Sequence, residues 1–200
     1  MNKTASKIPN HIREKLSLKI SPEHWLEKAR RLRKSSNYLF IEYEKEQGEY
    51  IDKFERDPNI SVASPDDDVV VLLLGFGIEN LLKGLFVAAA GQPLGRIQKL
   101  KTLKIPGGPH ELEPIADEIG KLLKIAFSDE ERRLLQALET YIRWRGRYPS
   151  ATDIENIIPI DDNGFFKNII LYYPNDHFDV ISLFDKLEHH LEEAIIRGGS

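Results

Sequence analysis

A continuous apolar stretch constrains the fold of this chain more than any other feature of its sequence. Residues 69–91 read VVVLLLGFGIENLLKGLFVAAAG, which could form a strand leading into a nucleotide-binding loop, a membrane span or a buried helix. A dinucleotide loop needs a third glycine, where Asn80 stands, and an acidic residue about 20 positions further on. Because no acidic residue lies between Glu79 and Glu111, the pattern argues against dinucleotide binding.

The charges inside the stretch argue against a membrane span. A span needs about 20 mostly apolar residues, but Glu79 and Lys83 stand near its middle, where an ionised residue costs ~2.5–3.5 kcal/mol. The acids at 66–68 suit a helix N-terminus, and Gly91 before Pro93 suits a helix end. The stretch therefore predicts the central buried helix of a soluble bundle. Its small residues share one helical face, where a neighbouring backbone can approach closely: Gly77, Gly84, Ala88 and Gly91.

Composition limits the chain to one core and removes several kinds of chemistry. Its 200 residues are 41% hydrophobic, which suits one domain over 21–200 after a flexible segment at 1–20. The chain has no cysteine, so disulfides, cysteine nucleophiles and thiolate metal sites are excluded. A net charge of −4 gives no global attraction to nucleic acid. The start, MNKTASKIPN, has no apolar h-region, so we expect a cytoplasmic protein.

Capping signals and apolar periodicity predict four further helices, over 21–47, from 110 or 114 to 126, and over 128–146 and 176–198. The first has a face that we expect to be solvated, with Glu27, Arg30, Arg31, Arg33 and Lys34. The others are expected to turn the following residues inward: Leu112, Ile115, Ile119, Leu122 and Leu123; Leu134, Leu135, Leu138, Tyr141 and Ile142; Phe178, Ile181, Phe184, Leu187, Leu191 and Ile195.

Two connections complete the expected architecture. Residues 92–109 form a long, basic connection rich in glycine and proline. Residues 150–175 form an irregular segment, in which Asn163-Gly164 could turn a short hairpin. The chain is therefore predicted to be an all-α, up-and-down bundle of four to five helices.

One polar pair is expected inside the bundle. Glu79 and Lys83 lie one helical turn apart, in the favourable order. Burial of either charge alone would be expensive, so we expect an internal ion pair that fixes packing or the register of a dimer. The alternative is a polar point in the core that recognises a ligand or another chain.

Two basic stretches are candidates for RNA binding. The long connection carries Arg96, Lys99, Lys101 and Lys104 without an acid, and YIRWRGRY over 141–148 combines Arg143, Arg145 and Arg147 with aromatic rings. Guanidinium groups bind phosphate, and aromatic rings stack on bases. The arginines could instead complement the dipole at a helix C-terminus. No histidine pattern, nucleotide loop or nucleophile elbow accompanies them, so we expect neither metal nor cofactor.

The order of these segments resembles a known superfamily. An apolar helix with IENLLKGLF, a loop, PHELEPIADEIGKLL, and a helix that ends in RYP resemble the HEPN-like proteins, small prokaryotic helical bundles. The resemblance covers roughly residues 21–149 and the last helix. It implies a homodimer in a toxin–antitoxin or phage-defence setting. It also implies, for active members, metal-independent cleavage of RNA by an arginine and a histidine four to six residues apart at the dimer cleft.

The sequence departs from that family at the catalytic motif. No arginine is followed by a histidine at the required spacing, since the next histidine after Arg147 is His177. We therefore expect a protein without the standard catalytic motif, which binds RNA or a partner protein encoded nearby. One alternative is an RNase with a rearranged site from His110, Arg143 and Arg147. Another is a protein-interaction module that does not contact nucleic acid.

Overall fold

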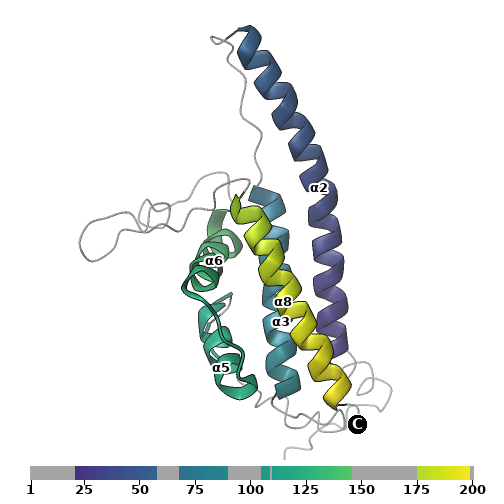
Figure 1. The fold of residues 1–200 in the computed structure, drawn as a ribbon, viewed down its shortest axis with the longest axis vertical. Helices are drawn as coiled ribbons and strands as arrows, with labels where there is room; N and C mark the ends of the chain where they lie inside the picture. The colour runs from purple at the N-terminus through teal and green to yellow at the C-terminus, as the bar shows by residue number, and fades with distance from the viewer. Residues whose placement is uncertain (1–20, 58–67, 90–104, 109, 146–174, 199–200) are drawn as a thin grey trace, which may run out of the picture.

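The computed structural model of the chain describes residues 21–57, 68–89, 105–108, 110–145 and 175–198. Within these residues the secondary structure is entirely helical, so the all-α prediction is confirmed. The segment 1–20, most of the basic connection and the segment 150–174 lie outside the described residues. In chain order, the elements are α2 (Pro22–Arg56), α3 (Asp68–Ala89), α5 (Glu113–Leu123), α6 (Asp129–Thr140), the π-helical turn η1 (Tyr141–Arg145) and α8 (Asn175–Gly198) (Figure 1).

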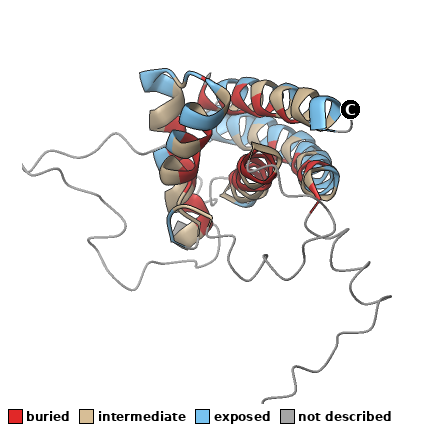
Figure 2. Ribbon diagram, turned by 90° about the horizontal axis from the view of Figure 1, so that it is seen from below, coloured by how far each residue is buried: buried red, intermediate tan, exposed pale blue. Residues whose placement is uncertain are grey.

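Helix α3 occupies the centre of the bundle. It packs against α2, α8, α5 and η1, and Figure 2 shows its mostly buried ribbon between the other helices. It is long and apolar enough to cross a membrane, but 72% of its most apolar window is buried inside the bundle. That burial is typical of the core helix of a soluble protein. The central buried helix predicted from the sequence is therefore present.

The small residues of α3 are used for contacts within the chain. A Cβ atom added to Gly77 would lie 2.7 Å from Cε2 of Phe184 and 3.6 Å from the carbonyl oxygen of Ala29. One added to Gly84 would lie 2.8 Å from Cδ2 of Leu191. The predicted close approach therefore exists at Gly77 and Gly84, and its partners are α2 and α8 of the same bundle, whereas Gly91 lies outside the described residues.

Helix α2 is longer than the sequence indicates. It continues to Arg56 rather than ending near Gln47. Gly48 interrupts the apolar pattern of the sequence at this point, but it does not break the helix. Tyr43 is its last buried residue, and beyond it the helix extends past the rest of the bundle (Figure 1). We call residues 44–56 the arm. The arm exposes apolar side chains, with Ile51 at 51% and Phe54 at 46% of full exposure.

The predicted solvated cationic face on α2 holds for Arg30, whose side chain is 49% exposed, but the side chain of Arg33 is only 25% exposed, and both arginines bind acids of α8. Arg30 donates to Glu188 at 2.6 Å and also to Glu192 on α8. Arg33 donates to Asp185 and lies 3.4 Å from Glu188. The first half of α2 is thus held to α8 by an ion network at the edge of their packed faces.

The capping box that opens α6 is confirmed. Ser128 Oγ accepts from the N–H of Glu131 at 3.1 Å, and a Glu131 carboxylate oxygen accepts from the N–H of Ser128 at 2.8 Å. The residues predicted to face inward from this helix and η1 are all buried: Leu134, Leu135, Leu138, Tyr141 and Ile142.

Two residues predicted to face inward are exposed, Leu122 at 46% and Phe178 at 57%. Helix α5 ends at Leu123 because Lys124 adopts a left-handed conformation with φ 60°, and the turn buries Ile125 in place of Leu122. Phe178 lies two positions, and so about 200°, from the buried Val180 on α8.

Candidate functional site

The predicted buried pair proves to be part of a three-membered cluster. Glu79 is 4% exposed, and one of its carboxylate oxygens accepts from Nζ of Lys83 one turn later on α3. The other oxygen, Oε2, lies 3.0 Å from Nδ1 of His110. Both oxygens of this buried carboxylate are therefore engaged by basic groups, as a charge in the core requires.

His110 is brought to α3 by the loop that leads into α5. Its ring meets Phe76 edge-on, with centroids 5.7 Å apart, and its backbone adopts a positive φ of 65°, which is uncommon for a residue with a side chain. An ionised carboxylate can only accept a hydrogen bond, so Nδ1 carries the proton in its contact with Glu79. In the neutral ring, Nε2 is then the basic nitrogen.

Arg143 is joined to the same loop. It donates from Nη2 to Oε1 of Glu111 at 2.8 Å, and the other oxygen of Glu111 accepts from the N–H of Gly108 at 2.6 Å. These contacts hold the pKa of Glu111 below its ordinary value, the N–H of Gly108 more strongly than Arg143. Because Glu111 follows His110 directly, the loop places a histidine beside a residue bound to an arginine.

Glu139, which the sequence did not indicate as a functional residue, also binds the loop. Oε1 of Glu139 accepts from the backbone N–H groups of Leu112 and Glu113 at 2.5 and 3.0 Å. It thereby supplies the N-terminal cap of α5, whose own N-cap residue makes no side-chain bond. Glu139 lies four residues before Arg143 on the α6–η1 segment, so one short segment binds the loop twice. No local sequence motif indicates such a distant cap.

The structure brings some of the predicted site residues together and leaves others undescribed. His110 on the loop 105–113 contacts Glu79, which is paired with Lys83, and Arg143 contacts Glu111 on the same loop. The backbone of Arg145 lies in η1. The other predicted RNA-binding residues fall outside the described part of the chain: Arg96, Lys99, Lys101, Lys104 and Arg147.

The described part of the site is close to charge balance. Lys83 and Arg143 are each paired with an acid, and Glu139 adds a third carboxylate that caps α5. An excess of positive charge at this surface would therefore have to come from the basic stretches 96–104 and 143–147, which adjoin it in sequence. No acid lies between positions 84 and 110.

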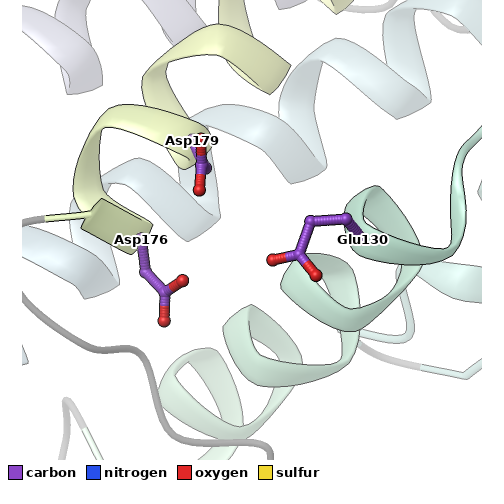
Figure 3. Close-up of side chains that lie close together, drawn as sticks. All are labelled: Glu130, Asp176 and Asp179. Carbon is purple, nitrogen blue, oxygen red and sulfur yellow. The ribbon is translucent and has the colours of Figure 1, made fainter.

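A second group of acids lies where α6 meets the start of α8. Carboxylate oxygens of Glu130, Asp176 and Asp179 lie within 4.8 Å of one another (Figure 3). Arg133 donates to Glu130 at 2.6 Å and to Asp176 at 2.5 Å, and these bonds raise the pKa of the arginine, Glu130 first. The guanidinium already supplies the positive charge that a metal ion would bring, so we interpret this group as a bridge between two helices.

No family model matches the sequence, and the comparisons with curated proteins and with solved structures found no similar protein.

Proposed function

We propose that this protein binds RNA at the loop 105–113 and the adjoining α6–η1 segment, as a cytoplasmic HEPN-like protein of a defence or stress system. The observation that carries the proposal is the contact between Arg143 and Glu111. It joins the start of one basic stretch, 143–147, to the loop that directly follows the other, 96–104. Two basic stretches that are far apart in sequence therefore adjoin one loop.

Electrostatic attraction to phosphates supplies most of the affinity of such a surface. An otherwise acidic chain of net charge −4 needs a local excess of positive charge to attract RNA. The two stretches contribute seven candidates: Arg96, Lys99, Lys101, Lys104, Arg143, Arg145 and Arg147. Phosphate contacts position a nucleic acid without reading its sequence, so we expect little preference between RNA sequences.

Salt and charge reversal test the proposal. Affinity for a single-stranded RNA, measured by fluorescence anisotropy, should fall about tenfold or more between about 50 and about 200 mM salt. The double variant Lys101→Glu/Lys104→Glu should bind every tested RNA more weakly, whereas the control Lys53→Glu on the arm should bind like the wild type. Binding that ignores salt and both reversals would exclude the RNA proposal and favour a partner protein encoded nearby, or a pure interaction module.

Cleavage of RNA is a second candidate function, and the contact between His110 and Glu79 favours it. A buried carboxylate on Nδ1 fixes the orientation and tautomer of the ring, which is the arrangement a general base needs. In this role Nε2 of His110 would take the proton of a ribose 2′-hydroxyl, whose oxygen attacks the adjacent phosphorus to form a 2′,3′-cyclic phosphate, and the displaced 5′-oxygen takes a proton from water. Arg143 would stabilise the charge on the phosphate.

The two functions are separated by incubating the protein with RNA in the presence of a chelator. The binding proposal expects intact RNA. Cleavage that His110→Ala abolishes, with RNA affinity retained, would establish the RNase instead. In that case Glu79→Gln should lower the rate and change its pH profile, because Glu79 positions His110 without touching RNA. Circular dichroism on both variants checks that the bundle remains folded.

A further inference from the structure

The outer face of α2 carries a stripe of exposed residues from Glu27 to Arg56 that is charged toward both ends. From Glu27 to Arg56, the residues of the stripe follow one another at steps of three or four positions. The average step is close to one helical turn, so these residues share one face of the helix. The charged residues near the two ends of this stripe are all exposed: Glu27, Arg31, Lys34, Glu49, Asp52 and Arg56.

The middle of the stripe is apolar. Tyr38 and Ile41 are 63% and 60% exposed, and Lys45 follows one turn later. The buried residues of α2 lie on the opposite face, where the bundle packs: Leu26, Ala29, Ser36 and Tyr43. The bundle therefore leaves the whole stripe accessible, as the exposed outer side of α2 in Figure 2 indicates.

The charges near the two ends of the stripe are arranged so that the stripe is complementary to a second copy of itself that runs in the opposite direction. About a point between positions 41 and 42, each charged residue near one end is matched by a residue of opposite charge at the same distance on the other side. The matched pairs are Glu27 with Arg56, Arg31 with Asp52, and Lys34 with Glu49. Tyr38 is matched with Lys45, a pair that can make a cation–π contact.

We propose that α2 pairs antiparallel with α2 of a second copy of this chain, about a two-fold axis that passes between positions 41 and 42. A two-fold interface brings the same surface of each copy together, so the surface must be its own complement, as this stripe is. Each matched pair then forms twice between the copies, while Tyr38 and Ile41 lie near the axis.

The contacts within one chain leave these residues able to exchange partners. Arg31 bonds to Glu27 on the same helix, and Glu49 lies 4.0 Å from Lys53. Arg31 is 77% exposed, and Glu27 and Glu49 are 57% exposed, so each contact is worth little in water. A second copy would replace them with pairs between chains that are shielded from solvent on one side.

Sedimentation of the full chain tests the pairing without any use of RNA, so its outcome is independent of the proposed function. The chain should associate into a species of twice its 23.0 kDa mass at low salt and dissociate as salt rises, because screening weakens exposed ion pairs. Lys34→Glu and Glu49→Lys should each weaken association by roughly tenfold or more, since symmetry replaces two attractive pairs with two repulsive ones.

The double variant Lys34→Glu/Glu49→Lys provides the decisive comparison. It restores opposite charges only in this antiparallel register, so association should recover to near the wild-type level. The matched control Lys28→Glu reverses a charge on the same helix away from the stripe and should change little. A monomer at every concentration, a dimer that ignores the single reversals, or a double variant that stays dissociated would each overturn the proposal.

Discussion

Helices α2 and α3 pack against each other more extensively than any other pair of described elements, yet they differ in what surrounds them. Helix α3 is covered on most sides and carries one buried acid, Glu79. Helix α2 buries one face, exposes an ionic stripe on the other and extends beyond the bundle as the arm. Changes in α3 and its contacts should therefore destabilise the fold, whereas changes on the outer face of α2 should affect association alone.

The largest loss of stability is expected where α8 packs against Gly77 of α3. Phe184 is fully buried against Gly77, and Phe184→Ala should lower the free energy of unfolding by about 3–5 kcal/mol, because it leaves a cavity beside a residue with no side chain to fill it. Urea denaturation measures the loss. Phe178→Ala, six residues earlier and 57% exposed, is the matched control and should change stability by less than about 0.5 kcal/mol.

Removal of the buried acid should rank next. Glu79→Ala leaves Lys83 and His110 without their carboxylate, and we expect a loss of about 3 kcal/mol. This is the low end for a buried pair, because Lys83 can turn toward water. The double variant Glu79→Ala/Lys83→Ala should lose less than the single one. Denaturation of Glu46→Ala on the arm gives the comparison. If Glu79→Ala costs no more than Glu46→Ala, the cluster does not organise the core.

A smaller effect is expected at the direct bond between the two helices. Ser36 is fully buried on α2 and donates from Oγ to the carbonyl oxygen of Val70 on α3 at 3.0 Å. Ser36→Ala should cost about 1 kcal/mol, because it removes one buried hydrogen bond. Ser35→Ala changes an exposed neighbour and should be neutral in the same thermal melts. Equal melting temperatures for both variants would mean that the bond contributes nothing.

The smallest effect is expected in the dependence of stability on pH, at a stacked pair of rings just before the arm. His177 stacks on Phe40 with ring centroids 3.8 Å apart, and burial lowers its pKa, although Glu44 opposes the shift. The unfolded chain then binds the proton more readily, so this stabilisation is complete above the ordinary value of about 6.5 and is lost as pH falls below it. His177→Phe should remove this component from the dependence of stability on pH. An unchanged dependence between pH 7 and about pH 5 would contradict the assignment.

The sequence predicted those features that depend on local patterns. The apolar stretch predicted α3, Ser128 and Glu131 predicted the start of α6, and the spacing of Glu79 and Lys83 predicted their pairing. Features that join distant segments could not be read in this way. No pattern indicates that His110 would reach Glu79, that Glu139 would cap α5, or that Arg30 and Arg33 would bind α8. Each of these contacts depends on how the helices pack.

Hydrogen exchange with mass spectrometry tests the central claim, that RNA binds at the loop 105–113 and the α6–η1 segment. The full chain is labelled with and without a saturating single-stranded RNA at low salt. We expect slower exchange in peptides that cover 105–113 and 141–145, and unchanged exchange in the arm, residues 44–56. Protection confined to the arm, or no protection in either region while RNA is bound, would contradict the claim.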